Sequence, residues 1–187
     1  MSSFVEQALE LAGNCNYQER PTEQHWLKVE AELGVKLPSE YKALVSRFGT
    51  GRFGGDLYVF NPAASKHIRL SKKDLEDLRQ EYAAFLDWLA QDGYRLYPEP
   101  GGIIITAATT SQISFGFQTK DCPVSDLIVV RFGAHECERL QMGLAEFICR
   151  LYRGELYGVG GLRTVIWNGS SDRFFTPFAT FNGDVEV

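Results

Sequence analysis

A glycine-rich stretch after Phe48 is the first part of the sequence whose residues could do chemistry. Residues 49–54 read GTGRFG, which matches G-x-G-x-x-G, the pattern of a dinucleotide-binding turn. Such a turn follows a strand and opens a helix, because the helix N-terminus binds the pyrophosphate. Here helical periodicity ends at Phe48, and the strand-like DLYVF follows the glycines. The sequence therefore predicts a structural turn in which Gly49 ends the helix, and it predicts no cofactor.

The histidines and cysteines do not have the spacing of a metal site or a nucleophilic site. His135-Glu136-Cys137 resembles the first part of the zinc deaminase pattern, but the P-C-x-x-C part does not follow it. His135 is instead expected in a turn. No cysteine pair has C-x-x-C spacing, and the G-x-S-x-G nucleophile motif does not occur. Cys149 lies in the apolar half of a predicted helix and is expected to be a small buried side chain.

These observations predict a protein that is not an enzyme, with no metal and no catalytic residue. The alternative that stays open is an enzyme whose site is assembled from segments distant in the sequence. A buried polar pocket that holds a histidine beside a cysteine or a carboxylate would favour that alternative.

The overall charge limits the classes of partner. The chain of 187 residues has 19 basic and 24 acidic side chains, a formal net charge of −5. A protein that binds nucleic acid usually carries a basic patch, so direct nucleic-acid binding is not expected. No apolar run reaches the length of about 20 residues that spans a bilayer, and the first residues lack the pattern of a signal peptide. We therefore expect a cytoplasmic protein with free thiols and no membrane contact, although the four cysteines could in principle form two disulfides.

Five segments have the apolar periodicity of helices. In the second of them Trp26, Val29 and Leu33 fall on one face at i, i+3 and i+7, and Thr22 is in place to cap the first turn. The fourth segment is the longest, and its polar face is mostly acidic. The five predicted helices are residues 3–12, 23–33, 38–48, 71–93 and 140–154.

Short β-branched or alternating runs between turn residues predict strands. They are DLYVF, IIIT, QISFGFQT, DLIVVRF and two further strands around Asn168-Gly169. Gly51, Gly54 and Gly55 are expected to reverse the chain into the first of these strands. Helices around a series of neighbouring strands predict an α+β fold, with a mainly antiparallel sheet covered by helices.

Residues 26–62 strongly resemble one block of the SUKH superfamily, which includes Smi/Knr-type cell-wall regulators and many bacterial immunity proteins. The block has a tryptophan and a glutamate, then Leu-Gly, Leu-Pro, a tyrosine and a glycine turn before a strand. The corresponding residues are Trp26, Glu30, Leu33, Gly34, Leu37, Pro38, Tyr41, Gly49 and Gly51. Their apolar members are expected to pack in the core, and Glu30 is expected to bond a nearby backbone group or a tyrosine hydroxyl.

The resemblance implies a single SUKH-like α+β domain over residues 1–187 without an active site. It covers residues 23–156, in which Phe117 stands where the family often has tryptophan. The remaining C-terminal extension, residues 157–187, has no counterpart in the family pattern. The sequence leaves open whether this extension joins the sheet or a partner.

The resemblance also implies a function through protein binding. Bacterial members are similar in role to antidotes, which bind and neutralise a cognate toxin that is often a nuclease. An acidic helix face would suit a basic nuclease, although such a face is by default the solvated surface of an amphipathic helix. The alternative is a regulatory scaffold of the Smi/Knr type with another partner, and the oligomeric state stays open. Candidate contact residues are Arg52, Phe53, Asp56, Asp77, Glu81, Asp87 and Glu99.

Overall fold

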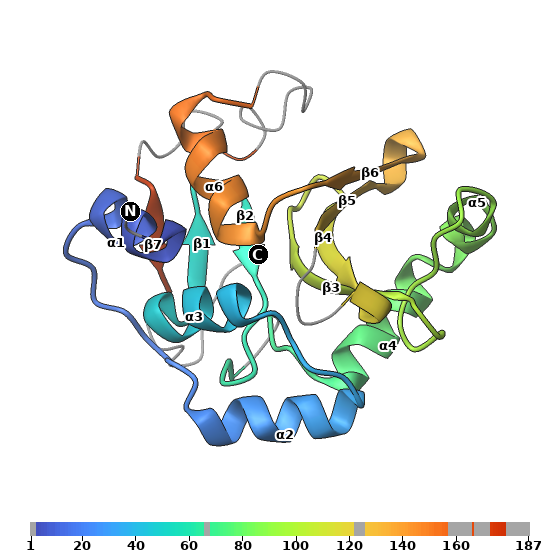
Figure 1. Cartoon of the computed structure of the whole chain (residues 1–187), viewed down its shortest axis with the longest axis horizontal. Coiled ribbons are helices and arrows are strands. Elements are labelled where there is room, and N and C mark those ends of the chain that lie inside the picture. Colours follow the sequence, from blue (N-terminus) through green and yellow to red (C-terminus); the bar gives the residue numbers. More distant parts are fainter. Residues whose placement is uncertain (1–2, 66–67, 122–125, 157–165, 167–172, 179–187) are drawn as a thin grey trace.

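A seven-stranded antiparallel sheet runs through the structure, with helices packed around it (Figure 1). The computed structural model describes residues 3–65, 68–121, 126–156, 166 and 173–178. Its α-helices are α1 Phe4–Ala12, α2 Glu23–Leu33, α3 Ser39–Phe48, α4 Lys72–Glu81, α5 Leu86–Gln91 and α6 Leu144–Arg153. Its strands are β1 Gly51–Phe53, β2 Leu57–Val59, β3 Ile103–Ala108, β4 Ile113–Gln118, β5 Leu127–Arg131, β6 Glu136–Leu140 and β7 Phe175–Pro177. The predicted α+β fold with a mainly antiparallel sheet is therefore confirmed.

The sheet is a meander with one returning strand. Strands β1 to β6 pair in chain order, each antiparallel to the next, and β7 pairs with β1 to give the order β6-β5-β4-β3-β2-β1-β7. In the β1–β7 ladder Phe53 lies opposite Phe175, and Gly51 lies opposite Pro177. The question left open by the sequence is thus answered for β7, since this part of the C-terminal extension joins the sheet. The predicted turn at Asn168-Gly169 lies outside the described residues.

The first three helices begin and end where the sequence predicts. Helix α1 follows Ser3, whose hydroxyl accepts a hydrogen bond from the Glu6 amide while the Glu6 carboxylate accepts one from the Ser3 amide. Helix α2 ends at Gly34, which has a left-handed backbone with φ of 71°. Helix α3 begins after Pro38, whose fixed φ suits a helix start, and it ends at Gly49.

The predicted single helix over 71–93 is wrong, because the chain breaks at Tyr82. Helix α4 ends at Glu81, a 3₁₀ turn spans Ala83–Phe85, and α5 follows. The Tyr82 ring stacks on Phe132, which follows β5, with 3.7 Å between ring centroids and 12° between planes. Neither glycine nor proline occurs between Ser71 and Gly93, so the break coincides with a tertiary contact and with no local signal.

Two other element boundaries also differ from the predictions. Leu140, predicted inside the last helix, is the final residue of β6 and pairs with Leu127, while α6 begins at Leu144. Gly51, predicted to help reverse the chain, begins the unpredicted strand β1. The reversal into β2 is made by residues 54–56, which leaves Gly54 and Gly55 in their predicted role.

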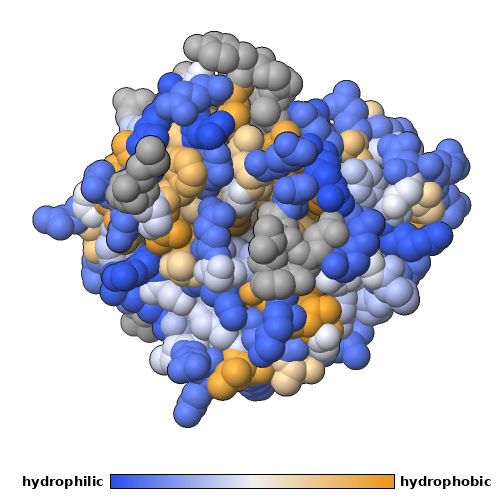
Figure 2. Space-filling view, in the orientation of Figure 1, coloured by the Kyte–Doolittle hydropathy of each residue, from blue (hydrophilic) through white to orange (hydrophobic). Residues whose placement is uncertain are grey.

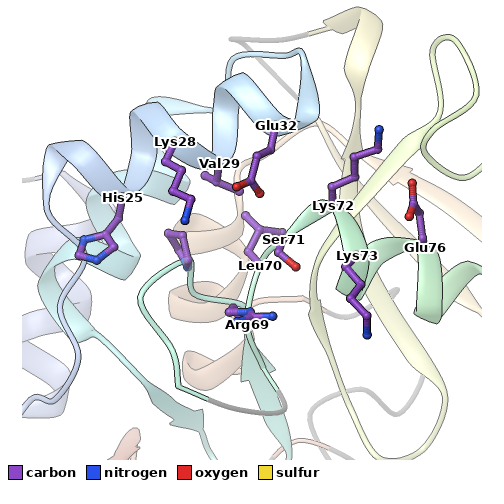
Figure 3. Close-up of a pocket in the computed structure, with 11 residues that line it drawn as sticks. His25, Lys28, Val29, Glu32, Arg69, Leu70, Ser71, Lys72, Lys73 and Glu76 are labelled. Atoms are coloured by element: carbon purple, nitrogen blue, oxygen red, sulfur yellow. The ribbon is translucent and has the colours of Figure 1, made fainter.

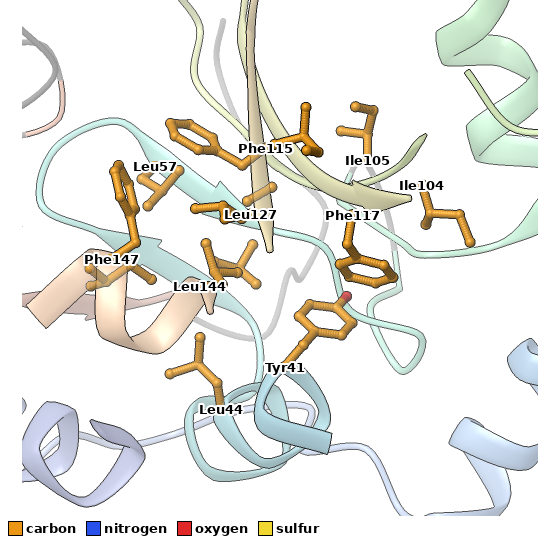
Figure 4. Close-up of a cluster of buried hydrophobic side chains, with 14 of the residues drawn as sticks. Tyr41, Leu44, Leu57, Ile104, Ile105, Phe115, Phe117, Leu127, Leu144 and Phe147 are labelled. Carbon is orange, nitrogen blue, oxygen red and sulfur yellow. The ribbon is translucent and has the colours of Figure 1, made fainter. Parts of the chain in front are cut away.

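Helices α3 and α6 pack on the sheet and enclose the main core (Figure 4). Tyr41 of α3 lies with its ring centroid 6.0 Å from that of Phe117, and Phe147 of α6 lies 5.2 Å from Phe115. The face of α6 that packs on the sheet is buried and includes Leu144, Phe147, Ile148 and Leu151.

Strand β7 completes this core with aromatic side chains. The Phe175 ring lies 4.8 Å from that of Phe48 and 4.9 Å from that of Phe53, and all three side chains are almost fully buried. The C-terminal extension therefore contributes to the same core as the segments that carry the family resemblance. None of the described helices has the length and apolar character needed to cross a membrane.

Candidate protein-interaction surfaces

The glycines of the G-x-G-x-x-G stretch are required by close backbone packing. Gly49 ends α3 with φ of 67°, and a Cβ atom there would lie 1.7 Å from the carbonyl oxygen of Gln18. Gly51 lies under Phe175, whose Cζ would be 2.3 Å from an added Cβ. The stretch joins a helix to a strand, which confirms the predicted order of elements. The tight approach of two other chain segments explains the glycines without a ligand.

The histidines with a described position have structural contacts. The His25 ring sits in the first turn of α2, where its Nδ1 accepts a hydrogen bond of 3.1 Å from the Thr22 amide. His135 is in a turn as predicted, with a left-handed backbone, and its ring lies 5.2 Å from Trp88 and 5.6 Å from Phe85. Over the described parts of the chain, His, Cys, Asp and Glu side chains form no group of three or more that could hold a metal ion. His67 lies outside the described residues.

The cysteines that the structure describes are free thiols. Cys149 is fully buried, as predicted, and its Sγ lies 3.4 Å from the carbonyl oxygen of Phe4. Burial raises the pKa of Cys149 to about 11, and burial together with the charge of Asp92 raises the pKa of Cys137 to about 12. Both thiols are therefore protonated near neutral pH, so neither supplies a ready thiolate nucleophile.

Residues 26–62 contain the family-signature residues, and we call this segment the signature block. Its side chains are linked by several hydrogen bonds and ion pairs. The Glu30 carboxylate is 3% exposed and accepts hydrogen bonds from the Leu37 amide at 2.9 Å, from Lys36 at 2.9 Å and from Lys42 at 2.8 Å. Burial acts to raise the pKa of Glu30, but these three donors outweigh it and hold the pKa below its ordinary value. The prediction of a backbone bond is confirmed, whereas the two lysine partners were not foreseen.

The aromatic residues of the signature block also bond through their polar atoms. The Trp26 ring packs edge-on against Tyr41, with centroids 5.7 Å apart, and its Nε1 donates to the Ser46 hydroxyl at 2.9 Å. The Tyr41 hydroxyl donates to the carbonyl of Phe60, which ties α3 to the end of β2. Trp26, Leu33, Leu37 and Tyr41 are all buried, so their predicted packing roles are confirmed.

Asn61 is an organising residue that the sequence analysis did not identify. Its side chain is fully buried and donates to the Glu19 carbonyl at 2.9 Å and to the Thr50 hydroxyl at 2.8 Å, and it accepts from the Ala63 amide at 2.8 Å. The sequence showed Asn61 only as part of an Asn-Pro pair that ends a strand. Its role depends on two segments brought together by the fold, so spacing alone could not reveal it.

The candidate contacts near the glycines are mostly inaccessible. Phe53, which the sequence analysis predicts as a contact residue, is 1% exposed and packs in the core, so this prediction is wrong. Asp56 is 7% exposed, and its Oδ1 accepts hydrogen bonds from the amide and the hydroxyl of Thr110. Arg52 is half-buried in β1, between Tyr58 of β2 and Thr176 of β7. A partner therefore does not reach Phe53 or Asp56 in this structure.

The acidic candidates lie on the α4–α5 arm, which we define as residues 72–91. Asp77 and Glu81 are exposed on α4, and Asp87 is exposed on α5. Because the chain breaks at Tyr82, these carboxylates do not lie on one continuous helix as the sequence suggested. Figure 2 shows that hydrophilic residues cover most of the side of the molecule where α5 lies.

Glu99 differs from the other acidic candidates because it is already paired. Its carboxylate lies 2.8 Å from Arg79 and 3.2 Å from Arg95. The hydrogen bond from Arg79, with the charge of Arg95, holds the pKa of Glu99 below its ordinary value. This pairing ties the loop before β3 to α4, so Glu99 is less available to a partner than Glu81 or Asp87.

A second carboxylate joins α3 to α6. The Glu40 side chain reaches the start of α6, where its Oε1 accepts a hydrogen bond of 3.1 Å from the Glu146 amide. An added Cβ at Gly143 would lie 1.6 Å from Glu40 Oε2, so a larger residue there would displace the Glu40 carboxylate from this position. Burial raises the pKa of Glu40 despite the amide bonds and is therefore the dominant effect.

Among the described residues, a groove of about 550 Å³ lies between α2 and the start of α4, and we call it the α2–α4 groove (Figure 3). Its base includes the apolar side chains of Val29, Leu70 and Pro62. Its other lining residues are mainly charged, with Lys28 and Glu32 reaching in from α2. Sequence analysis did not identify this groove, because its two sides are distant in the chain.

Comparison with protein families gives one match. The family model described as SMI1-KNR4 cell-wall (SUKH_6) matches residues 23–148, from the first residue of α2 into α6. The match includes the whole signature block, the α4–α5 arm and strands β1 to β6. No curated protein matches the chain significantly, and no solved structure does so either.

Proposed function

The chain belongs to the SMI1-KNR4 family of the SUKH superfamily, and on that premise we propose that it is a non-catalytic protein-binding module, an immunity protein that binds and neutralises a cognate toxin. The family match over residues 23–148 is the observation that carries this proposal. Inhibition by an immunity protein is stoichiometric, because the antidote covers the toxin and does not alter it chemically. The proposal therefore requires a stable surface that binds the toxin, and it does not require a catalytic site.

The character of the signature block supports a binding role. Its distinctive polar groups are engaged inside the fold, since Glu30 bonds Lys36, Lys42 and a backbone amide, and Asn61 bonds two backbone groups and a hydroxyl. Groups held in this way stabilise the scaffold and are not available to a substrate. The polar side chains of this block therefore have roles in stabilising the fold.

The α4–α5 arm supports a basic partner. Glu81 and Asp87 are exposed there, and the net charge of the chain is −5. Complementary charge increases the rate at which a cationic protein such as a nuclease finds its inhibitor. We propose the exposed carboxylates of this arm as part of the contact surface, together with Asp77.

The proposal is tested by co-expression of the chain with the product of a neighbouring gene that is toxic to cells when expressed alone. We expect the chain to restore growth of cells that produce the toxin, and to co-elute with the toxin at a one-to-one ratio in size-exclusion chromatography. Absence of both protection and complex would exclude the immunity role. Protection without a complex would exclude inhibition by binding.

The family description also favours a second candidate, a regulator of cell-wall functions that acts as a scaffold. This candidate requires a partner other than a toxin. Affinity purification of the tagged chain would then recover a cell-wall-related protein, and deletion of the gene would change sensitivity to cell-wall stress. A gene neighbourhood without a toxin, combined with that phenotype, would favour the regulator over the immunity protein.

A further inference from the structure

The α2–α4 groove gathers cations on a chain that is acidic overall. Its lining contains Lys28, Arg69, Lys72 and Lys73, whereas its carboxylates are those of Glu32 and Glu76. Four basic groups against two acidic ones oppose the net charge of −5 for the whole chain. The lining of the groove therefore has a local excess of basic side chains, in contrast to the acidic balance of the whole chain.

Two of these cations are available to a partner. Arg69 pairs with Asp74 at 3.1 Å, and Lys73 pairs with Asp77 at 2.8 Å. Lys28 and Lys72 are exposed, and within the described parts of the chain neither makes an ion pair. In Figure 3 the Lys28 side chain extends from α2 into the groove, at the end nearer His25.

His25 adds a hydrogen-bond donor at one end of the groove. Its Nδ1 lies 3.1 Å from the Thr22 amide and 2.9 Å from the Thr22 hydroxyl, so this nitrogen acts as an acceptor. A neutral imidazole whose Nδ1 accepts carries its proton on Nε2. The other ring nitrogen is thus a donor, which suits an acceptor-rich ligand as the lysines do.

We infer that the α2–α4 groove binds an acidic segment of a protein partner. Carboxylates of the segment would meet Lys28 and Lys72, while its apolar side chains would cover the base formed by Val29, Leu70 and Pro62. A volume of about 550 Å³ accommodates several side chains and is larger than a single phosphate needs. The inference goes beyond the proposed function, because it concerns the groove between α2 and the first turn of α4, and a partner segment of opposite charge.

The same features favour a peptide over a nucleic acid. Glu32 and Glu76 stand among the cations and would repel a continuous phosphate backbone. An acidic peptide can place its carboxylates away from these two side chains. Its apolar side chains would also be stabilised by burial against the apolar base of the groove. A phosphate backbone would gain no such stabilisation, because its charged groups cannot be buried favourably against apolar side chains.

The probe is a short fluorescein-labelled peptide that alternates glutamate and leucine, titrated with the purified full chain at low ionic strength. Fluorescence anisotropy should report saturable binding that weakens as salt is added, because exposed charges are screened. The double variant Lys28→Glu and Lys72→Glu should weaken this binding by about tenfold or more, since it removes two attractive contacts and introduces repulsion.

The matched control is the double variant Lys120→Glu and Arg47→Glu, which makes the same change of charge at exposed residues outside the groove. It should bind the peptide within about twofold of the parent chain. Equal weakening by both double variants would overturn the inference, because the binding would then follow net charge alone. Stronger competition by a single-stranded oligonucleotide than by unlabelled peptide of equal charge would also overturn it, in favour of a nucleic-acid site.

Discussion

The signature block and the α4–α5 arm place their charged residues in opposite ways. In the block the Glu30 carboxylate is buried and satisfied by three donors from the same unit. In the arm Glu81 and Asp87 face water, and the helix itself is interrupted at Tyr82. We therefore expect the signature block to stabilise the fold, and we expect the exposed residues of the arm to tolerate substitution with little effect on stability. Substitutions in the two regions should therefore have separable effects.

The largest effect is expected at Gly49. Alanine at this position would have to keep φ of 67° and would place its Cβ 1.7 Å from the carbonyl of Gln18. Backbone strain and the forced shift of that segment should together lower the free energy of unfolding by about 4 kcal/mol. Chemical denaturation of Gly49→Ala measures this loss.

Gly34→Ala is the matched control for the same kind of backbone. Gly34 has φ of 71°, but an added Cβ would meet nothing within 4 Å. We expect a loss of about 1 kcal/mol from the backbone alone. Equal losses for the two variants would show that the close packing of the glycine stretch contributes nothing.

The next largest effect is expected for Glu30→Ala, which leaves the Leu37 amide and the Lys42 ammonium without their acceptor. The loss of unfolding free energy should be about 3 kcal/mol at neutral pH, because a buried pair is broken from one side. Glu32→Ala, two residues further on and exposed, should change it by less than about 0.5 kcal/mol.

The pH dependence of the stability lost in Glu30→Ala follows from the direction in which the pKa of Glu30 is shifted. The pKa of Glu30 is held below its ordinary value of 4.5 in the folded chain, so its stabilising effect is present above that value. The effect is lost as the pH falls through the lower, folded-state pKa. The stability difference between the parent chain and Glu30→Ala should therefore shrink at acid pH, and a constant difference would contradict the buried ion pair.

Glu40→Gln should have a smaller effect with the opposite pH trend. The pKa of Glu40 is raised in the folded chain, so folding disfavours its charged form and the parent chain loses stability as the pH rises through the folded-state pKa. Glutamine does not titrate, so the stability of the variant relative to the parent should increase with pH, by about 1 kcal/mol or less. Denaturation curves at several pH values check the slope, and parallel curves would contradict it.

The smallest effect on stability is expected in the arm. The double variant Glu81→Lys and Asp87→Lys should change the free energy of unfolding by less than about 0.5 kcal/mol, because both side chains are exposed. The same variant should weaken a complex with a basic partner by about tenfold or more. Thermal denaturation and a binding titration measure the two quantities separately.

The control for the arm reverses Glu10 and Glu155, which are exposed elsewhere on the chain. This variant has the same net charge as the arm variant, but its substitutions lie outside the arm. It should therefore weaken the complex much less than the arm variant does. A large loss of unfolding free energy in the arm variant would show that the arm also stabilises the fold. The two regions would then not have separable effects.

The sequence predicted best what depends on neighbouring residues. The bounds of α2 follow from the Trp26 stripe, the cap at Thr22 and the stop at Gly34, and all of these act within a few residues. The strand-like runs from IIIT to DLIVVRF also correspond to β3, β4 and β5. The burial of the signature aromatics was foreseen for the same reason, since their spacing defines one helix face.

The errors occur where a distant segment decides the local structure. Strand β1 has only three residues, with a glycine at its start, and it depends on pairing with both β2 and β7. Phe53 is buried because Phe174 and Phe175 pack against it from the far end of the chain. The break at Tyr82 coincides with stacking on Phe132 and has no glycine or proline to announce it.

The sequence alone was enough to predict the fold class, the ends of the first three helices, the family and the structural nature of the glycine stretch. These features depend on periodicity, capping and backbone freedom, which are properties of short segments. The folded structure was needed to show which charges are buried, which candidate contacts are accessible and where the α2–α4 groove lies. Those properties depend on segments that are far apart in the chain and meet only after folding, so local pattern carries no information about them.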